Sequence, residues 1–416
     1  MIHKSVTIIF LSALVYSNLT LAGGPLILEG PYGHTAVTYQ NPNITLHIES
    51  GDLGTRTNEA TNIIVEDALN LWNNVNTSTI NLKTEALNDD INFNNFDQYL
   101  PSPDDAFFNA DDNLNPIIYD SDGKIIEAFF GNQSEFIAGF AASFFTNNGS
   151  YFQEGYAVIN GNTKEPLSDT ELKLLITHEI GHFFGLDHSQ TNINNQETNS
   201  GFPQVCSTTS KSNYPVMYPF ICRDGELHSD DISAVSALYP SANINNNYGI
   251  LHGHFVNNSG SPILGANIWA ENIVSGETYS IVSDYLRQGT GYYKLLLPAG
   301  TYTLHANSIN TLFYSGSGVG PYAETTTDAS FTAPHPITPQ VNYLGINESN
   351  EEIINIATNQ SLIINFSSAG KFVIFPEKNN DDDDNSLADI FGATSLQTTL
   401  LIIFSVAAGR RLNSRL

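Results

Sequence analysis

The feature that most constrains this chain is an eleven-residue run, HEIGHFFGLDH, which begins at His178. His178 and His182 are four residues apart, so on an α-helix they lie on the same face. Gly185 stands where a helix commonly ends in a left-handed residue. A turn at this glycine brings His188 back toward the other two histidines. The run therefore predicts three imidazoles that converge at the end of one helix.

The flanking sequence supports that helix. Ser168 and Glu171 form the S-x-x-E pattern of a capping box at its start. An apolar stripe at helical spacing follows and can be buried: Leu172, Leu175, Ile176, Ile180 and Phe183. Ordinary core or surface histidines on an amphipathic helix are the alternative interpretation. That alternative does not explain the shared register of the histidines, the glutamate and the glycine, so we favour a metal site.

Three converging imidazoles are a ligand set for zinc. A catalytic zinc ion keeps three protein ligands and one position for water, and it lowers the pKa of that water from about 16 to about 7. Glu179, beside the first ligand, is placed to take a proton from this water and pass it to a leaving amine. The run thus predicts zinc-dependent hydrolysis of peptide bonds, with His178, His182 and His188 as metal ligands and Glu179 as the catalytic residue.

The pattern HExxHxxGxxH resembles the metzincin peptidases, which also carry a methionine-containing turn beneath the metal. Met217, in the segment YPVMYP, is similar to the Met-turn of the matrixin family. Ser189, directly after the third histidine, also resembles matrixins, and these two residues disfavour the other metzincin families. Tyr218 is not assigned as a metal ligand, because the astacin-type tyrosine stands one place later.

The resemblance extends over about half of the chain, residues 40–242. A strand at 44–48 and a tryptophan-containing helix at 58–75 look like the opening of a matrixin catalytic domain. A helix at 229–239, stopped by Pro240, is similar to its closing helix. The resemblance implies an α+β fold for this domain, with a twisted mixed sheet and three helices.

The chain departs from vertebrate matrixins in three respects. Residues 191–213 form a polar insertion that would border the substrate pocket, so the resemblance implies no cleavage specificity. No histidine lies between His47 and His178, so a second, structural zinc ion has no evident ligands. No cysteine precedes the catalytic helix, so the cysteine switch that keeps relatives latent is missing.

Composition narrows the class of partner. The chain has 15 basic and 43 acidic residues, a formal net charge of −28, which disfavours nucleic-acid binding. Protein or peptide substrates are the expected partners. The segment Asp120-Ser121-Asp122-Gly123 resembles the start of a calcium loop but lacks the full EF-hand spacing. A turn is the favoured interpretation, and Ca²⁺ at Asp120 and Asp122 is the alternative.

The only two cysteines, Cys206 and Cys222, flank the Met-turn. In an oxidising compartment a disulfide between them would stabilise the fold by about 3 kcal/mol. Two free buried thiols are the alternative.

The two ends of the chain predict export. Residues 1–22 read as a secretory signal peptide. Residues 390–409 are uncharged and just long enough to span a bilayer, and three arginines follow, which place the tail in the cytoplasm. An acidic linker, a span and a basic tail resemble the C-terminal sorting signals of bacterial exported proteins. A plain single-span anchor is the alternative, and both place the zinc site at the cell surface or outside the cell.

The region after the peptidase domain alternates in strand-length segments, which predicts a β-sandwich. Residues 261–268 and 297–304 look like the carboxypeptidase-regulatory-like fold, a small transthyretin-like sandwich. Pro298-Ala299-Gly300 supplies a turn, after which Tyr302 and Leu304 point inward. His252 and His254 share one face of a strand, and we favour exposed strand residues over a metal site.

The expected organisation is a signal peptide at 1–22, a matrixin-like zinc peptidase domain at 23–242, a carboxypeptidase-regulatory-like sandwich at 248–372, an acidic linker at 377–389 and a transmembrane or sorting segment at 390–416. The expected function is a secreted or surface-anchored zinc endopeptidase. A non-catalytic surface binding protein that retains a metzincin scaffold is the alternative, which the retention of Glu179 and all three histidines disfavours.

Overall fold

The computed structural model describes residues 24–29, 34–99, 113–145, 150–192, 211–223, 225–309, 318–321, 340–346 and 350–374. The expected signal peptide, acidic linker and C-terminal segment lie outside these residues, as does most of the polar insertion at 191–213. Within the described part of the chain, no helix is both long enough and apolar enough to cross a bilayer. The predicted membrane segment at 390–416 is therefore untested.

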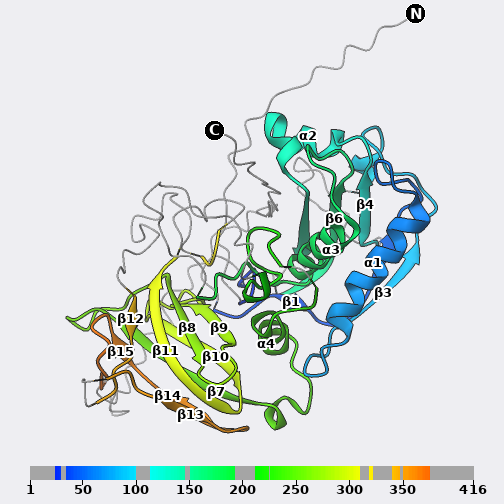
Figure 1. The fold of residues 1–416 in the computed structure, drawn as a ribbon. Helices are drawn as coiled ribbons and strands as arrows, with labels where there is room; N and C mark the ends of the chain where they lie inside the picture. Colours follow the sequence, from blue (N-terminus) through cyan, green and yellow to red (C-terminus); the bar gives the residue numbers. More distant parts are fainter. Residues whose placement is uncertain are drawn as a thin grey trace, which may run out of the picture.

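The chain forms two lobes that meet at helix α4 (Figure 1). The N-terminal lobe, residues 24–240, is built on a six-stranded mixed sheet. Five strands run parallel in the order β1-β6-β4-β2-β3, and β5 pairs antiparallel with β6. The strands are β1 (Thr38–Tyr39), β2 (Asn43–Ile48), β3 (Asn81–Ala86), β4 (Pro116–Asp120), β5 (Gly139–Phe145) and β6 (Tyr151–Asn160).

Helices cover both faces of this sheet. One face shares a hydrophobic core with α1 and α3, and the opposite face packs against α2. The helices are α1 (Asn58–Asn73), α2 (Lys124–Phe130), α3 (Asp169–Phe183) and α4 (Ser229–Leu238). The expected strand at 44–48 and the expected helices at 58–75 and 229–239 are confirmed, while α2 adds a helix that the sequence did not predict. Short 3-10 turns are η1 (Phe96–Gln98), η2 (Gly131–Phe136), η3 (Lys211–Asn213) and η4 (Ile244–Asn246).

The C-terminal lobe, residues 248–374, contains two sheets that enclose one core (Figure 1). One sheet has the order β10-β7-β14, with β15 also on β7. The other is antiparallel, with the order β12-β11-β8-β9 and β13 on β11. The strands are β7 (Tyr248–Val256), β8 (Ala266–Asn272), β9 (Thr278–Val282), β10 (Tyr292–Pro298), β11 (Gly300–Ser308), β12 (Val341–Asn342), β13 (Ile354–Ile356), β14 (Ser361–Ile363) and β15 (Phe366–Ser367).

Alternation along the strands builds this second core. Tyr302 and Leu304 on β11 are fully buried, as the sequence predicts, and they pack with apolar side chains from β7, β8 and β10. β10 ends at Pro298 and β11 begins at Gly300, so the expected turn is also confirmed. The two-sheet arrangement confirms a β-sandwich at the level of layers.

Close packing beneath α3 depends on a residue without a side chain. Gly181 of α3 faces Met217, whose Sδ would overlap a Cβ at this position, and Cζ2 of Trp72 would lie only 3.2 Å away. Trp72, on α1, is fully buried, and its indole N–H donates to the Thr177 carbonyl at 2.9 Å. Gly181 therefore lets the indole and the thioether lie directly against the helix.

A buried carboxylate ties the sheet to a neighbouring loop. Glu49, just after β2, is 1% exposed and accepts hydrogen bonds from the backbone N–H groups of Ile91 and Tyr119. Burial raises the pKa of Glu49 from its usual 4.5 to about 8, although the two hydrogen bonds act in the opposite direction. The folded state therefore holds a proton on this group more tightly than the unfolded chain does.

Gly181→Ala is expected to lower the free energy of unfolding by about 1–3 kcal/mol, because the added methyl group overpacks against Met217. In a Met217→Ala background the same substitution should cost less, because only the tight contact with Trp72 then remains and alanine is the better helix former. Urea unfolding of the four proteins in this double-mutant cycle measures both values. An equal loss in the two backgrounds would contradict the contact.

Glu49 should contribute a decrease in the free energy of unfolding as the pH rises from about 4.5 to about 8, with a slope of at most about 1.4 kcal/mol per pH unit. The sign follows because the folded-state pKa lies above the unfolded value, so the folded state binds more protons in this range. Glu49→Gln cannot titrate and should remove this part of the slope. Urea unfolding across the range tests this, and identical slopes in the two proteins would show that Glu49 is not the source.

Candidate metal centre

The three histidines of the eleven-residue run meet at one point. Nε2 of His182 lies 3.0 Å from Nε2 of His178 and 3.2 Å from Nε2 of His188, and the third separation is also 3.2 Å. A tetrahedral zinc ion with bonds of about 2.0–2.1 Å holds its nitrogen ligands about 3.3 Å apart. Each of the three residues is no more than 2% exposed. The predicted convergence is confirmed, and it is the one potential metal cluster among the described residues.

The opposite nitrogen of each ring contacts a backbone carbonyl. Nδ1 of His178 lies 2.7 Å from the Val216 oxygen, and Nδ1 of His182 lies 2.8 Å from the Leu186 oxygen. Nδ1 of His188 lies 2.9 Å from the oxygen of Gly318, in the C-terminal lobe. A carbonyl only accepts, so each Nδ1 carries the hydrogen and each Nε2 presents its lone pair.

Three lone pairs that face one another in a buried space repel unless a cation lies between them. Carbonyl partners on the outer nitrogens are the arrangement that fixes ring orientation in metal sites. The donor set therefore fits a divalent metal ion such as zinc.

Burial also keeps the rings neutral. Desolvation lowers the pKa of His178 to about 4, against a small opposing effect of its carbonyl partner. Desolvation lowers the pKa values of His182 and His188 well below the usual range, and the neighbouring imidazoles lower them further. Neutral imidazole is the form that binds a metal, so the three groups are ready to bind without first losing a proton.

Local sequence explains how α3 presents these rings. The hydroxyl of Ser168 accepts from the Glu171 N–H at 3.3 Å, while the Glu171 carboxylate accepts from the Ser168 N–H at 2.9 Å, so the predicted capping box is present. The helix ends at Phe183, and Gly185 has φ +105°, which a side chain would disfavour. The turn at this glycine returns the chain, so His188 reaches the two helical ligands as predicted.

Met217 lies against α3 at Gly181, and its place beneath a metal ion stays a prediction. It is 1% exposed, and its carbonyl accepts from the Ser189 N–H at 2.8 Å. Asp231 of α4 holds the turn, since its carboxylate accepts from the N–H groups of Val216 at 2.7 Å and Met217 at 3.0 Å. This role of Asp231 was not predicted from the sequence, although paired aspartates at the start of a helix are a visible signal.

Glu179 is fully buried on α3, between the first two ligands in sequence. Its side chain runs beside β5, where a Cβ on Gly139 would lie 3.4 Å from Cγ and 3.5 Å from Oε1 of Glu179. The carboxylate therefore lies buried beside Gly139 of β5 rather than on the surface.

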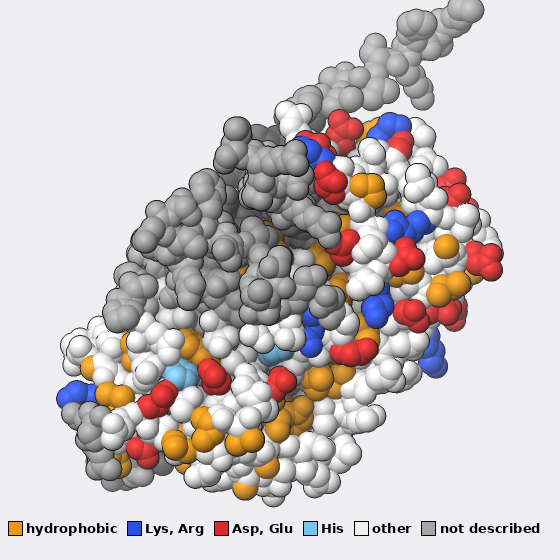
Figure 2. Space-filling view, viewed as in Figure 1, with side chains coloured by type: hydrophobic (Ala, Val, Ile, Leu, Met, Phe, Trp, Pro, Cys, Tyr) orange, Lys and Arg blue, Asp and Glu red, His pale blue; other side chains and the backbone are white. Residues whose placement is uncertain are grey.

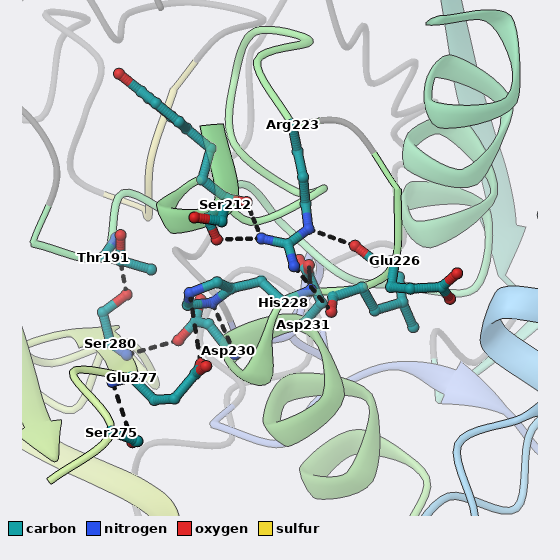
Figure 3. A network of polar contacts seen from close by, with 12 residues as sticks. Thr191, Ser212, Arg223, Glu226, His228, Asp230, Asp231, Ser275, Glu277 and Ser280 are labelled. Carbon is teal, nitrogen blue, oxygen red and sulfur yellow. Dashed lines mark hydrogen bonds and ion pairs between the residues drawn. The ribbon is translucent and has the colours of Figure 1, made fainter. Parts of the chain in front are cut away.

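The segment after the third histidine is held by the C-terminal lobe, which sequence reasoning did not foresee. Ser280 of β9 donates its backbone N–H to Asp230 of α4 at 2.6 Å, and its hydroxyl accepts from the Thr191 N–H at 3.1 Å (Figure 3). Burial raises the pKa of Asp230 to about 7, against the hydrogen bonds from Ser189 and Ser280. No local sequence signal marks this junction, because its partners lie about 50 to 90 residues apart.

The residues suggested for calcium have other partners in the turn. Asp120 accepts from the N–H groups of Ile125 at 3.1 Å and Ile126 at 2.8 Å, and burial raises its pKa to about 6. Asp122 forms an ion pair with Lys124. Gly123 has φ +75° immediately before α2. These contacts favour the turn interpretation, and calcium binding by Asp120 and Asp122 stays a prediction.

The predicted disulfide stays untested, whereas both strand histidines lie among the described residues. Cys222 is buried and is not a free thiol, but Cys206 lies outside the described residues, so the disulfide between them stays a prediction. His252 and His254 are half-buried on β7, where they contact Ser361 and the Thr290 carbonyl. Neither belongs to a metal cluster among the described residues.

Acidic side chains are spread over the exposed surface of the N-terminal lobe, with Lys and Arg scattered between them (Figure 2). This distribution follows from the net charge of −28. The described side chains on this face gather into no basic patch.

Comparison with known proteins adds no family. No protein-family model matches the chain, and no curated protein matches it either. The buried group of three histidines, which could hold a metal ion such as zinc, is the feature of the described residues that points to a chemistry.

Proposed function

We propose that this chain is a zinc-dependent endopeptidase of the matrixin type. The observation that carries the proposal is the meeting of three Nε2 atoms within 3.2 Å at the end of α3, with a buried glutamate in the same turn of helix. Bound zinc supplies a Lewis acid that polarises a carbonyl and acidifies a water molecule.

Individual residues of the chain hold the metal, transfer the proton and support the helix. His178, His182 and His188 hold the metal through Nε2, and their carbonyl partners fix the ring orientations. Glu179 acts as general base, accepting a proton from the attacking water and passing it to the leaving amine. Met217 supports α3 from below.

The matrixin assignment has further support beyond the ligands. The tryptophan-containing helix α1, the Met217 turn and the closing helix α4 all lie in one core with α3. The metzincin fold of the N-terminal lobe and the transthyretin-like fold of the C-terminal lobe belong to the same proposal. So do the domain boundaries, with a signal peptide at 1–22 and a membrane or sorting segment at 390–416, which would place the enzyme outside the cytoplasm.

The purified full chain is expected to bind one zinc ion, and His182→Ala should abolish this binding because two ligands do not complete the site. His254→Ala is the matched control, since it removes a half-buried histidine outside the cluster. Metal content after dialysis against dilute zinc measures the stoichiometry. Equal zinc contents in the two variants would contradict the proposed site.

Glu179→Gln should keep the zinc ion but slow the cleavage of a denatured protein by about 100-fold to 10,000-fold, the usual contribution of a general base. Glu127→Gln, on the exposed face of α2, is the control and should cleave at the wild-type rate. The rates are compared with and without a zinc chelator.

Two outcomes would count against the mechanism. Wild-type cleavage by Glu179→Gln would exclude the proposed general base. A wild-type protein that binds zinc but cleaves no denatured protein would favour the alternative, a non-catalytic surface binding protein with a metal-stabilised scaffold.

A further inference from the structure

The third ligand and the three residues that follow it are enclosed between the two lobes. Residues His188, Ser189, Gln190 and Thr191 are at most 2% exposed. The other two ligands have their outer nitrogens fixed by carbonyls of the N-terminal lobe itself, at Val216 and Leu186. His188 differs, because its carbonyl partner belongs to Gly318, which follows β11 in the C-terminal lobe.

Every residue of this segment contacts the C-terminal lobe. Besides the contact of His188 with Gly318, the contacts are Ser189 Oγ to Ser280 Oγ at 3.1 Å, Gln190 Nε2 to the Ser308 carbonyl at 3.3 Å, Thr191 N–H to Ser280 Oγ at 3.1 Å, and Asn267 Nδ2 to the Thr191 carbonyl at 2.6 Å. Asn267 and Ser280 lie on neighbouring strands β8 and β9, paired in one sheet. The outer face of that sheet therefore forms a continuous support for the segment.

Asp230 joins the segment, α4 and β9 at one point. Its carboxylate accepts from the Ser189 hydroxyl. It also accepts, at 2.6 Å, from the Ser280 backbone N–H (Figure 3). Asp230 is 2% exposed, so it cannot exchange these donors for water without opening the junction. The two lobes are thus held in one relative position by buried hydrogen bonds between defined partners.

An apolar cluster fixes the carbonyl of Gly318. Its neighbour Val319 is fully buried. The cluster contains Tyr214, Tyr218 and Cys222 from the N-terminal lobe and Val282, Ile309 and Val319 from the C-terminal lobe. Tyr218 directly follows Met217, so the same cluster packs against the Met-turn. Loss of the packing of the Val319 side chain would therefore loosen the Gly318 carbonyl that contacts Nδ1 of His188.

We propose that the C-terminal lobe contributes to zinc binding, because it fixes the orientation of the third ligand, His188. Val319 and Ser280 are positioning residues, which act on the metal through Gly318 and the segment 188–191. The inference rests on the proposed zinc site and adds that zinc affinity depends on the docking of the sandwich. Loss of a partner behind a metal-binding histidine typically weakens metal binding by about 10-fold to 100-fold.

The test compares two double variants of the full chain. Ser280→Ala/Val319→Ala removes one buried hydroxyl and two methyl groups at the junction. Ser283→Ala/Val341→Ala removes the same groups from the same lobe, since Ser283 bonds only within it, to Ile263 and Ala266, and Val341 packs in its core. Zinc dissociation constants are measured by competition with a chromogenic chelator. Thermal unfolding of the metal-free proteins reports stability separately.

The junction variant should bind zinc at least about 10-fold more weakly than wild type. The control should bind zinc as wild type does, even if both variants lose similar thermal stability. Equal zinc affinities in the two variants, with wild-type binding that depends on His182, would overturn this inference and leave the proposed zinc site standing. Wild-type protein that binds no zinc would overturn both.

Discussion

Three imidazole lone pairs directed at one point are the constraint on which the rest of the structure depends. Without a cation this arrangement is repulsive, and burial removes the water that would otherwise separate the rings. The fold has to hold them together by other means. Each outer nitrogen is hydrogen-bonded to a backbone carbonyl. Unlike a side-chain acceptor, a backbone carbonyl cannot move away through a change of rotamer, so the ring orientations are fixed.

These carbonyls come from three separate parts of the chain. Leu186 follows the α3 turn, Val216 belongs to the Met-turn, and Gly318 belongs to the C-terminal lobe. Two buried aspartates brace the parts against α4, since Asp231 holds the Met-turn and Asp230 holds the junction with β9. The histidine cluster is therefore assembled by tertiary contacts around one helix, and both lobes contribute to it.

A good part of this could be predicted from the sequence because the signals are local. The S-x-x-E cap fixes the start of α3, the four-residue spacing puts His178 and His182 on one face, and Gly185 supplies the turn that returns His188. The alternation around Tyr302 predicts a sandwich strand in the same way. Ser280 and Gly318 could not be found by such reasoning, because their partners lie about 90 and 130 residues away in the sequence.

The sequence by itself determined which histidines meet, since helix periodicity and one glycine turn set their convergence within eleven residues. Only the tertiary structure decided what surrounds them. The docking of the sandwich against residues 188–191 depends on the complementary shapes of two folded surfaces and on polar pairs about 50 to 130 residues apart. The sequence carries no periodic signal for such pairs, so the contact of the second lobe with His188 appears only when both lobes are folded together.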